Sequence, residues 1–311
     1  MRACRTFLES LELPGGDLGH LPDAPKRFAD GARYRVEIPS CEGPRCLDAL
    51  LETAARLDVL VHRASQGSGV FMLTDAELAE MASMARAATV EISLFARPNA
   101  AWDTSGMARS PAGGAVAAAS RGQEQIVQGL ADARRAAGAG VRSVLIADVG
   151  LLDVFAEARR RDFLPAGMQA KISVMLPVAN PATARALVVL GADTLNLTTD
   201  LSLAQIAAIR SVVDVPLDIY VEVPDNVGGF VRLHEIPEIV RVAAPVYLKF
   251  GLRNAPDVYP AGTHLDATTI ALTRERVRRA RLGMELLARE WPGCETSELG
   301  ASGLALVHAA A

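Results

Sequence analysis

Hydrophobic residues follow two alternating patterns along this chain. Short segments rich in β-branched residues alternate apolar and polar positions, and each is followed by a segment with apolar residues at helical spacing, such as Leu47, Leu50 and Ala54. Strand–helix alternation with short connections predicts parallel strands and right-handed crossovers, and eight such units predict a closed (β/α)8 barrel of the TIM type, an α/β fold. The predicted strands are Tyr34–Ile38, Val59–Arg63, Val90–Ala96, Ser143–Asp148, Ala170–Met175, Thr194–Thr198, Leu217–Val223 and Val246–Phe250.

The barrel is predicted to occupy residues 31–290, between an N-terminal extension over 1–30 and a peripheral, frayed C-terminal tail over 291–311. The spacing of the strands is regular except between the third and the fourth. There the segment Arg97–Gly122, rich in Gly, Ala, Ser and Pro, forms a long insertion before the next helix. Such an insertion is either a lid or binding loop, or a tolerated mobile loop.

Composition narrows the classes of partner. The net charge of −4 and the lack of a basic block argue against nucleic acid, and arginines in the last predicted helix (274–281) are expected to form a solvated face. No apolar run approaches the roughly 20 residues of a membrane span, and no signal peptide is visible, so a cytoplasmic location without membrane association is expected. A homo-oligomer is possible. The four cysteines are too scattered for a disulfide scaffold.

The register of the strands predicts a polar barrel interior. In a closed barrel the helix-facing positions must be apolar, so the alternate positions point into the lumen. This places four acids and four bases inside: Glu37, Glu91, Asp218, Glu222, Arg35, Arg97, Lys171 and Lys249. Buried charges are costly unless paired, so these side chains either form a structural salt-bridged network, bind a ligand, or both.

Lysine is the scarce cation here, with three lysines among 32 Lys and Arg residues. Lys249 ends the eighth strand at the expected active-site mouth, and a lysine there suits Schiff-base or general-base chemistry. Glu222 on the neighbouring strand would tune it, although a purely structural Lys249–Glu222 pair is an equal alternative. The other candidate catalytic residues at strand ends are Glu37 and Asp148, and the deeper supporting candidates are Lys171, Glu91, Asp218 and Tyr220.

A small anionic substrate, a carboxylate or a phosphate, is the expected ligand. Barrels commonly bind phosphate in the loops after strands seven and eight. The candidate binding residues are Arg63, Arg97, Thr198, Arg253, Gly228 and Gly229. Glycine also serves ordinary turns, so each loop alone is a weak signal.

The carboxylates would alternatively bind a divalent metal ion, and the sequence does not identify a cofactor. Glu37, Asp148 and Glu222, with His62, would offer oxygen and imidazole ligands. No HxH or HExxH motif accompanies them, so no metal ligand is assigned.

The stretch GADTLNLTTDLSLAQIAAIR, followed by VDVPLDIYVEVPDNVGGFVRLHEIPEIVRVAAPVYLKFGLRNAP, resembles the peptidase U32 family over about residues 191–256. The resemblance implies a TIM-like barrel, and no catalytic signature of the family transfers residue by residue. The sequence therefore favours a barrel enzyme with lyase or isomerase chemistry based on a strand-end lysine. There are two alternatives. One is a U32-type peptidase or other hydrolase, with or without assistance from a metal ion, and the other is a non-catalytic ligand-binding barrel.

Overall fold

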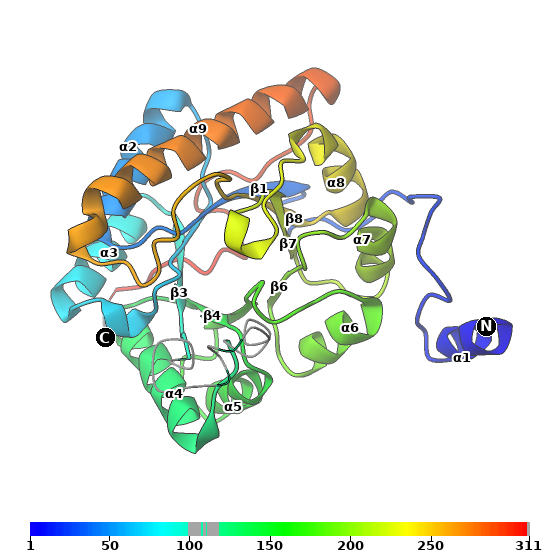
Figure 1. The fold of residues 1–311 in the computed structure, drawn as a ribbon, viewed down its shortest axis with the longest axis horizontal. Helices are drawn as coiled ribbons and strands as arrows, with labels where there is room; N and C mark the ends of the chain where they lie inside the picture. The colour runs from blue at the N-terminus through cyan, green and yellow to red at the C-terminus, as the bar shows by residue number, and fades with distance from the viewer. Residues whose placement is uncertain (99–106, 108–109, 111–117, 310–311) are drawn as a thin grey trace.

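The chain folds into a closed barrel of eight parallel strands in the order β1 to β8, as predicted (Figure 1). The computed structural model describes residues 1–98, 107, 110 and 118–309. Most of the insertion Arg97–Gly122 therefore lies outside the described residues. The strands are β1 Tyr34–Pro39, β2 Arg63–Ser65, β3 Glu91–Phe95, β4 Ser143–Ile146, β5 Gln169–Ile172, β6 Thr194–Asn196, β7 Leu217–Glu222 and β8 Val246–Phe250.

Helices surround the barrel on its outside (Figure 1). Side-chain caps begin several of them: Thr74 and Ser202 form capping boxes, and Asn180 caps a helix that starts with proline. The α-helices are α1 Arg2–Ser10, α2 Pro44–Leu57, α3 Asp75–Ala87, α4 Gly122–Gly138, α5 Val149–Arg160, α6 Pro181–Val189, α7 Leu203–Arg210, α8 Ile236–Ala243 and α9 Asp266–Glu290. Short 3-10 turns are η1 Val70–Met72, η4 Asp225–Val227, η5 Leu233–Glu235 and η6 Thr263–Leu265.

The second strand begins four residues later than predicted. Residues 59–62 lead out of α2, whose cap residue Asp58 has a left-handed backbone (φ 52°), and the paired strand starts only at Arg63. Arg63 pairs in register with Glu37 on β1 and Glu91 on β3. Arg63 therefore lies at the start of its strand, deep in the lumen, and the prediction that it lies at the mouth was wrong.

A bulge in β7 changes the direction of Glu222. Tyr220 pairs with Lys249, but two residues on, Glu222 pairs with Phe250 instead of the residue after it. Phe250 faces the helices, where it packs against Gly283 of α9. Glu222 consequently faces the helix layer, and the expectation that it points into the lumen was wrong.

The C-terminal tail is an integral part of the barrel, contrary to the expectation that it is peripheral and frayed. Residue Thr296 pairs with Tyr34 at the start of β1, and Ala305 N donates to Glu91 Oε2 at 3.2 Å. The Arg35 guanidinium donates to Ser297 Oγ at 2.8 Å and to the Ser302 carbonyl at 2.7 Å. The tail thus closes the end of the barrel at which the strands begin.

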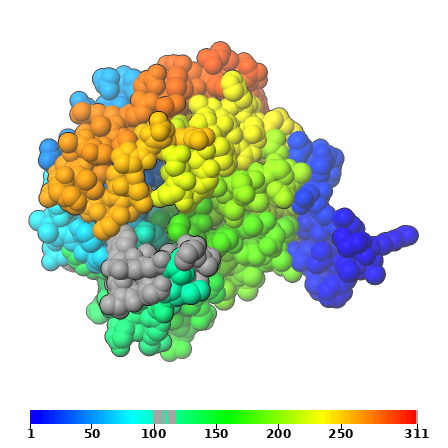
Figure 2. Space-filling view, viewed as in Figure 1, coloured from blue at the N-terminus to red at the C-terminus, as the bar shows by residue number. Residues whose placement is uncertain are grey.

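The N-terminal helix α1 has the opposite character. None of its residues is buried, and it projects from the body of the molecule (Figure 2). The extension that follows does contact the barrel, since Ala24 N donates to the Arg241 carbonyl at 2.8 Å. Among the described residues, no helix combines the length and apolar character that a membrane span requires.

Candidate active site at the barrel mouth

The centre of the lumen is a network of paired charges around Glu37, which is fully buried. Glu37 Oε2 accepts from Lys171 Nζ at 2.8 Å, and Glu37 Oε1 lies 3.1 Å from Lys249 Nζ. Ser65 Oγ also donates to Glu37 Oε1 at 2.7 Å. One carboxylate therefore joins the two lysines, and the predicted convergence of Glu37, Lys171 and Lys249 is what the structure shows.

Arg63 completes the network below the two lysines. Its guanidinium lies 2.6 Å from Glu91 and 3.2 Å from both Glu37 and Asp218, and it stacks on Tyr247 with 3.6 Å between the guanidinium carbon and the ring centroid. Asp218 also bonds Lys171 and accepts from Thr194. Three cations thus face three anions: Arg63, Lys171 and Lys249 against Glu37, Glu91 and Asp218.

Burial and pairing oppose each other in the pKa values of this network. Burial alone would raise the pKa of Glu37, but Lys171, Lys249 and Arg63 together hold that pKa well below its usual range. For Lys171 burial is the larger effect and lowers its pKa to about 8, against the opposing attraction of Asp218 and Glu37. The deep lysine is therefore less basic than an exposed one.

Lys249 connects this network to a cavity of about 660 Å³ at the carboxyl ends of the strands. Its side chain lines the cavity and is 2% exposed, with Nζ 4.5 Å from the centroid of the Tyr220 ring. Of the lysines, only Lys249 lines this cavity, whereas Lys171 lies beneath it and Lys26 pairs with Asp214 elsewhere. This volume is within the range of small-molecule sites.

Asn196 holds Lys249 from the side opposite Glu37. The amide orientation that satisfies both ends of Asn196 places Oδ1 2.9 Å from Lys249 Nζ and 3.3 Å from Val174 N, while Nδ2 donates to the Asp218 carbonyl at 3.2 Å. Tyr220, predicted as a deeper support, lines the cavity instead. Lys249 Nζ is thus fixed by a carboxylate, an amide and an aromatic face.

Asp148 and Glu222, predicted to be catalytic, have other partners. Both carboxylate oxygens of Asp148 accept backbone N–H groups, from Leu151 at 2.8 Å and from Ser120 at 3.0 Å, so Asp148 caps α5. Glu222 accepts from Arg253 N at 3.0 Å and lies 3.8 Å from Arg279 Nε of α9. Lys249 is paired with Glu37 rather than with Glu222, because of the β7 bulge.

Most of the predicted anion-binding residues lie away from the cavity. Arg253 is half-exposed and pairs with Asp225 at 3.4 Å, while the amides of Gly228 and Gly229 donate within their own turn to Asp225 and Pro224. Thr198 lies beyond the end of β6 and does not line the cavity. Arg97 does line it, donates to the Gly67 carbonyl at 3.1 Å, and has its pKa lowered by burial.

The four side chains considered as metal ligands do not converge. Glu37 belongs to the lysine network, Asp148 caps a helix, Glu222 faces α9, and His62 Nε2 bonds the Ser297 carbonyl of the tail. Within the described part of the chain, no three His, Cys, Asp or Glu side chains are grouped as a metal site.

Several cavity residues were not predicted. Ser40 and Tyr259 form a hydrogen-bonded hydroxyl pair in the loops after β1 and β8, and Arg276 of α9 was assigned to a solvated face although it is 5% exposed. The helical spacing could have predicted that Arg276 is buried, because it lies three residues after Thr273 and four residues before Ala280, both of which are buried.

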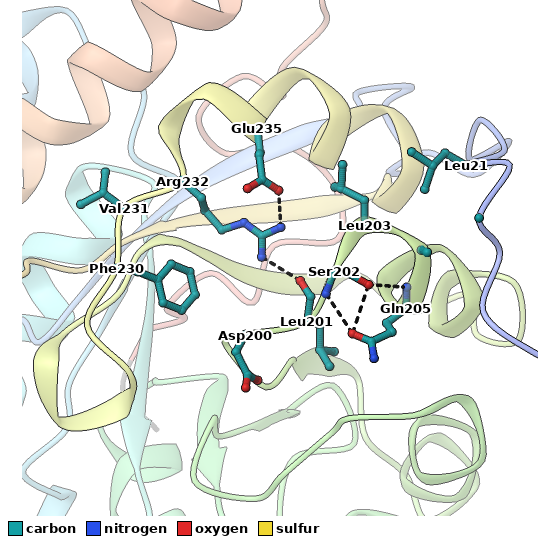
Figure 3. A pocket seen from close by; sticks show the side chains of 12 residues that line it. Leu21, Asp200, Leu201, Ser202, Leu203, Gln205, Phe230, Val231, Arg232 and Glu235 are labelled. Atoms are coloured by element: carbon teal, nitrogen blue, oxygen red, sulfur yellow. Dashed lines mark hydrogen bonds and ion pairs between the residues drawn. The ribbon is translucent and has the colours of Figure 1, made fainter.

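A second hollow of similar volume lies over the N-terminus of α7, beside the N-terminal extension (Figure 3). Several of its charged and polar side chains are already paired: Arg232 bonds Glu235 and the Leu201 carbonyl, and Ser202 and Gln205 form the capping box. With no lysine in its lining, this hollow does not compete with the mouth cavity as a catalytic site.

Fold and cavity together define a TIM-type (β/α)8 barrel with a lysine at the floor of its mouth. No family model matches the chain, and no curated protein matches it in sequence. Among solved structures it is similar to a Coccidioides immitis protein proposed to be a fructose-1,6-biphosphate aldolase, with 15% identity, a TM-score of 0.50, and coverage of 83% of this chain and 92% of that one.

Two further similarities are weaker. A truncated 3-deoxy-D-arabino-heptulosonate 7-phosphate synthase from Thermotoga maritima shares 14% identity over 87% of this chain and 94% of its own, with a TM-score of 0.45. A U32 peptidase shares 18% identity over 64% and 72%, with a TM-score of 0.39. The similarity to the Coccidioides immitis structure agrees with a common barrel fold, and the U32 similarity remains a resemblance.

Proposed function

We propose that this barrel is a lyase or isomerase that acts on a small anionic carbonyl compound, with Lys249 as the Schiff-base-forming residue. The observation that supports this most is the position of Lys249, the one lysine in the lining of the mouth cavity. Its ammonium is fixed by Glu37, Asn196 and the Tyr220 ring, so the reacting nitrogen is held in place before any substrate arrives.

The chemistry begins when Lys249 Nζ, having released a proton, attacks the substrate carbonyl carbon. The carbonyl oxygen leaves as water, and a protonated imine forms. The electron pair of a neighbouring C–C or C–H bond then enters the imine and gives an enamine. In the C–C case the departing fragment carries a hydroxyl, which loses its proton to solvent and becomes a carbonyl; in the C–H case the proton itself passes to solvent. Protonation and hydrolysis return product and free lysine.

The charge balance of the network around Glu37 favours the protonated imine on Lys249. With Lys249 charged, three cations oppose three anions; a neutral amine leaves one excess negative charge. A protonated imine restores the positive charge at the same atom, close to Glu37 and over the Tyr220 ring, which attract a cation. The network therefore stabilises the imine more than the neutral amine from which it forms.

The test is borohydride trapping with a panel of 2-oxo acids and phosphorylated carbonyl compounds, followed by intact-mass and peptide mapping. A reduced adduct on Lys249 is expected. The adduct should be absent from Lys249→Met and should remain in Lys26→Met, because Lys26 is partly exposed and lies outside the cavity. Turnover of a compound without any adduct on Lys249 would refute the imine mechanism.

A further inference from the structure

Arg276 extends from the outer helix α9 to the mouth cavity, and its guanidinium has few partners. The residue is 5% exposed and lines the cavity. Nη1 donates to the Ser40 carbonyl at 3.4 Å, and the buried Nε has no hydrogen-bond partner among the described residues. Within the same part of the chain, no carboxylate lies within ion-pair distance of Arg276.

The other buried arginines show how different this is. Arg63 contacts three carboxylates, Arg35 donates to Ser297, Tyr247 and Ser302, and Arg210 donates to four backbone carbonyls. Arg232 bonds a carbonyl and a carboxylate. Arg63, Arg210 and Arg232 also each have one buried nitrogen without a partner among the described residues, but their other nitrogens make two or more bonds, whereas Arg276 makes one bond of 3.4 Å. The burial of the Arg276 guanidinium is therefore the least compensated of the five.

The arginines nearest to Arg276 on α9 are less buried than it is, and each has a carboxylate partner. Arg274 pairs with Glu52, Arg278 and Arg279 pair with Glu275, and Arg281 pairs with Glu285. These side chains form the solvated face that the sequence predicts. Arg276 instead shares the inward face with Thr273, Val277 and Ala280.

The side chains beside Arg276 suit an anion. The Ser40 and Tyr259 hydroxyls are hydrogen-bonded to each other next to it, and Arg97 lies 5.8 Å from the Tyr259 ring centroid on the other side. Arg276 is near enough to lower the pKa of the Tyr259 and Tyr220 hydroxyls, against the larger effect of burial, which raises both. Hydroxyl donors and two guanidinium groups thus line one side of the cavity. The buried Glu42 carboxyl is also within electrostatic reach of Arg276, but burial raises its pKa and its oxygens already accept from Gly67 N at 2.7 Å and Ser68 N at 2.9 Å.

We propose that Arg276 binds the anionic group of the substrate, a carboxylate or a phosphate, and so orients its carbonyl towards Lys249. A guanidinium presents two parallel N–H donors that match either oxyanion. The assignment rests on the proposed function for the identity of the reacting partner, but the anion site itself is independent of Lys249. Arg276 is a specificity-determining residue and takes no part in bond making.

Binding of two simple anions, oxalate and inorganic phosphate, measured by calorimetry tests the assignment. Arg276→Gln is expected to weaken the preferred anion about 10- to 100-fold, the range for hydrogen bonds to charged groups, whereas Arg274→Gln on the surface of the same helix changes affinity less than twofold. Stronger binding of oxalate indicates a carboxylate substrate, and stronger binding of phosphate indicates a phosphorylated one.

Two more variants separate the outcomes. Arg276→Lys keeps the charge but loses the paired donors, so it should fold normally and bind the anion more weakly than the unmodified protein. Lys249→Arg keeps a positive charge beside Glu37 but cannot form an imine, so it should lose imine trapping while the anion still binds. Unchanged affinity in both Arg276 variants, or no binding of either anion by the unmodified protein, overturns the Arg276 assignment. Absence of trapping in an unmodified protein that binds the anion overturns only the lysine mechanism.

Discussion

His62 shows how a single buried side chain makes the stability of this barrel depend on pH. It is fully buried, its Nδ1 accepts from Val36 N at 3.0 Å, and its Nε2 donates to the Ser297 carbonyl at 2.7 Å. Burial lowers its pKa to about 4, assisted by Arg35 and opposed by the bond to Ser297. Because Nδ1 is an acceptor, protonation would break a hydrogen bond inside the protein.

The free energy of unfolding is expected to fall by about 2 to 3 kcal/mol between pH 7 and pH 4.5 through His62 alone. The unfolded state binds a proton near pH 6.5 and the folded state only near pH 4, so stability is lost as pH falls through this window. Denaturant titrations across the range measure it. His62→Gln should be less stable at pH 7, and its free energy of unfolding should change less with pH. The control His264→Asn, at an exposed histidine, should keep the full pH dependence. An unchanged pH dependence in His62→Gln would contradict the assignment.

At the scale of elements, α9 connects the barrel wall to the substrate cavity. Gly283 lets this helix approach β8: an added Cβ would lie 2.7 Å from a ring carbon of Phe250 and 2.9 Å from Ile236 Cδ1. About two turns closer to the N-terminus of α9, the same face of the helix presents Arg276 to the mouth cavity. The close approach at Gly283 therefore helps to set the depth that Arg276 reaches.

Gly283→Ala is expected to destabilise the protein by about 1 to 3 kcal/mol, although alanine is the better helix former. The reason is overpacking against the Phe250 ring. Gly138→Ala, at the end of α4 with open space around it, is the matched control and should change stability by less than about 1 kcal/mol, towards greater stability. Thermal or denaturant unfolding decides, and equal effects of the two substitutions would argue against close packing at Gly283.

The same scale shows what the sequence could and could not predict. Alternation of apolar residues correctly placed Glu37, Lys171, Asp218 and Lys249 in the lumen, since a helix-facing apolar set determines the opposite face. It failed at Glu222, because a bulge leaves no trace in the alternation. It also failed at Arg63, where residues 59–62 are apolar enough to resemble a strand yet only lead into one.

The remaining failures arise from contacts between distant segments. Asp148 lies just after β4 and Arg253 lies in the loop after β8, as expected, but Asp148 caps α5 and Arg253 pairs with Asp225. Arg276 lies on a helix rather than a strand, so a search of strand ends passes over it. Which of several adjacent arginines turns inward depends on the packing of α9 against the barrel, and that is a property of the tertiary structure.

At the scale of the whole molecule, the two ends of the described chain have unequal structural roles. The tail supplies partners to Arg35, His62 and Glu91 at the lower end of the lumen. Helix α1 buries none of its residues. Residues 1–30 carry nine charged residues and residues 291–311 carry two, but the predicted strand pattern includes neither extension, so the packing of the tail appears only in the fold.

Removal of residues 295–311 is expected to lower the melting temperature by more than 10 °C or to prevent folding, because it leaves buried donors and acceptors of the lumen unpaired. Removal of residues 2–10 should change the melting temperature by less than about 2 °C, since it exposes no core. Differential scanning calorimetry of both truncations, with circular dichroism to confirm helix and sheet content, gives the comparison. A tail deletion that melts like the full chain would show that the floor of the barrel is dispensable.

The equality of positive and negative charges in the lumen has a consequence for how this sequence can change over evolutionary time. Glu37, Lys171 and Lys249 are contributed by three strands far apart in the chain, yet the Glu37 carboxylate pairs with both lysines in the buried interior. A mutation that removes any one charge leaves an isolated ion in the interior, so a tolerated change requires a second change on a different strand. Homologous barrels should therefore vary at these positions together, by exchange or loss of whole ion pairs, while the surface arginines of α9 drift independently.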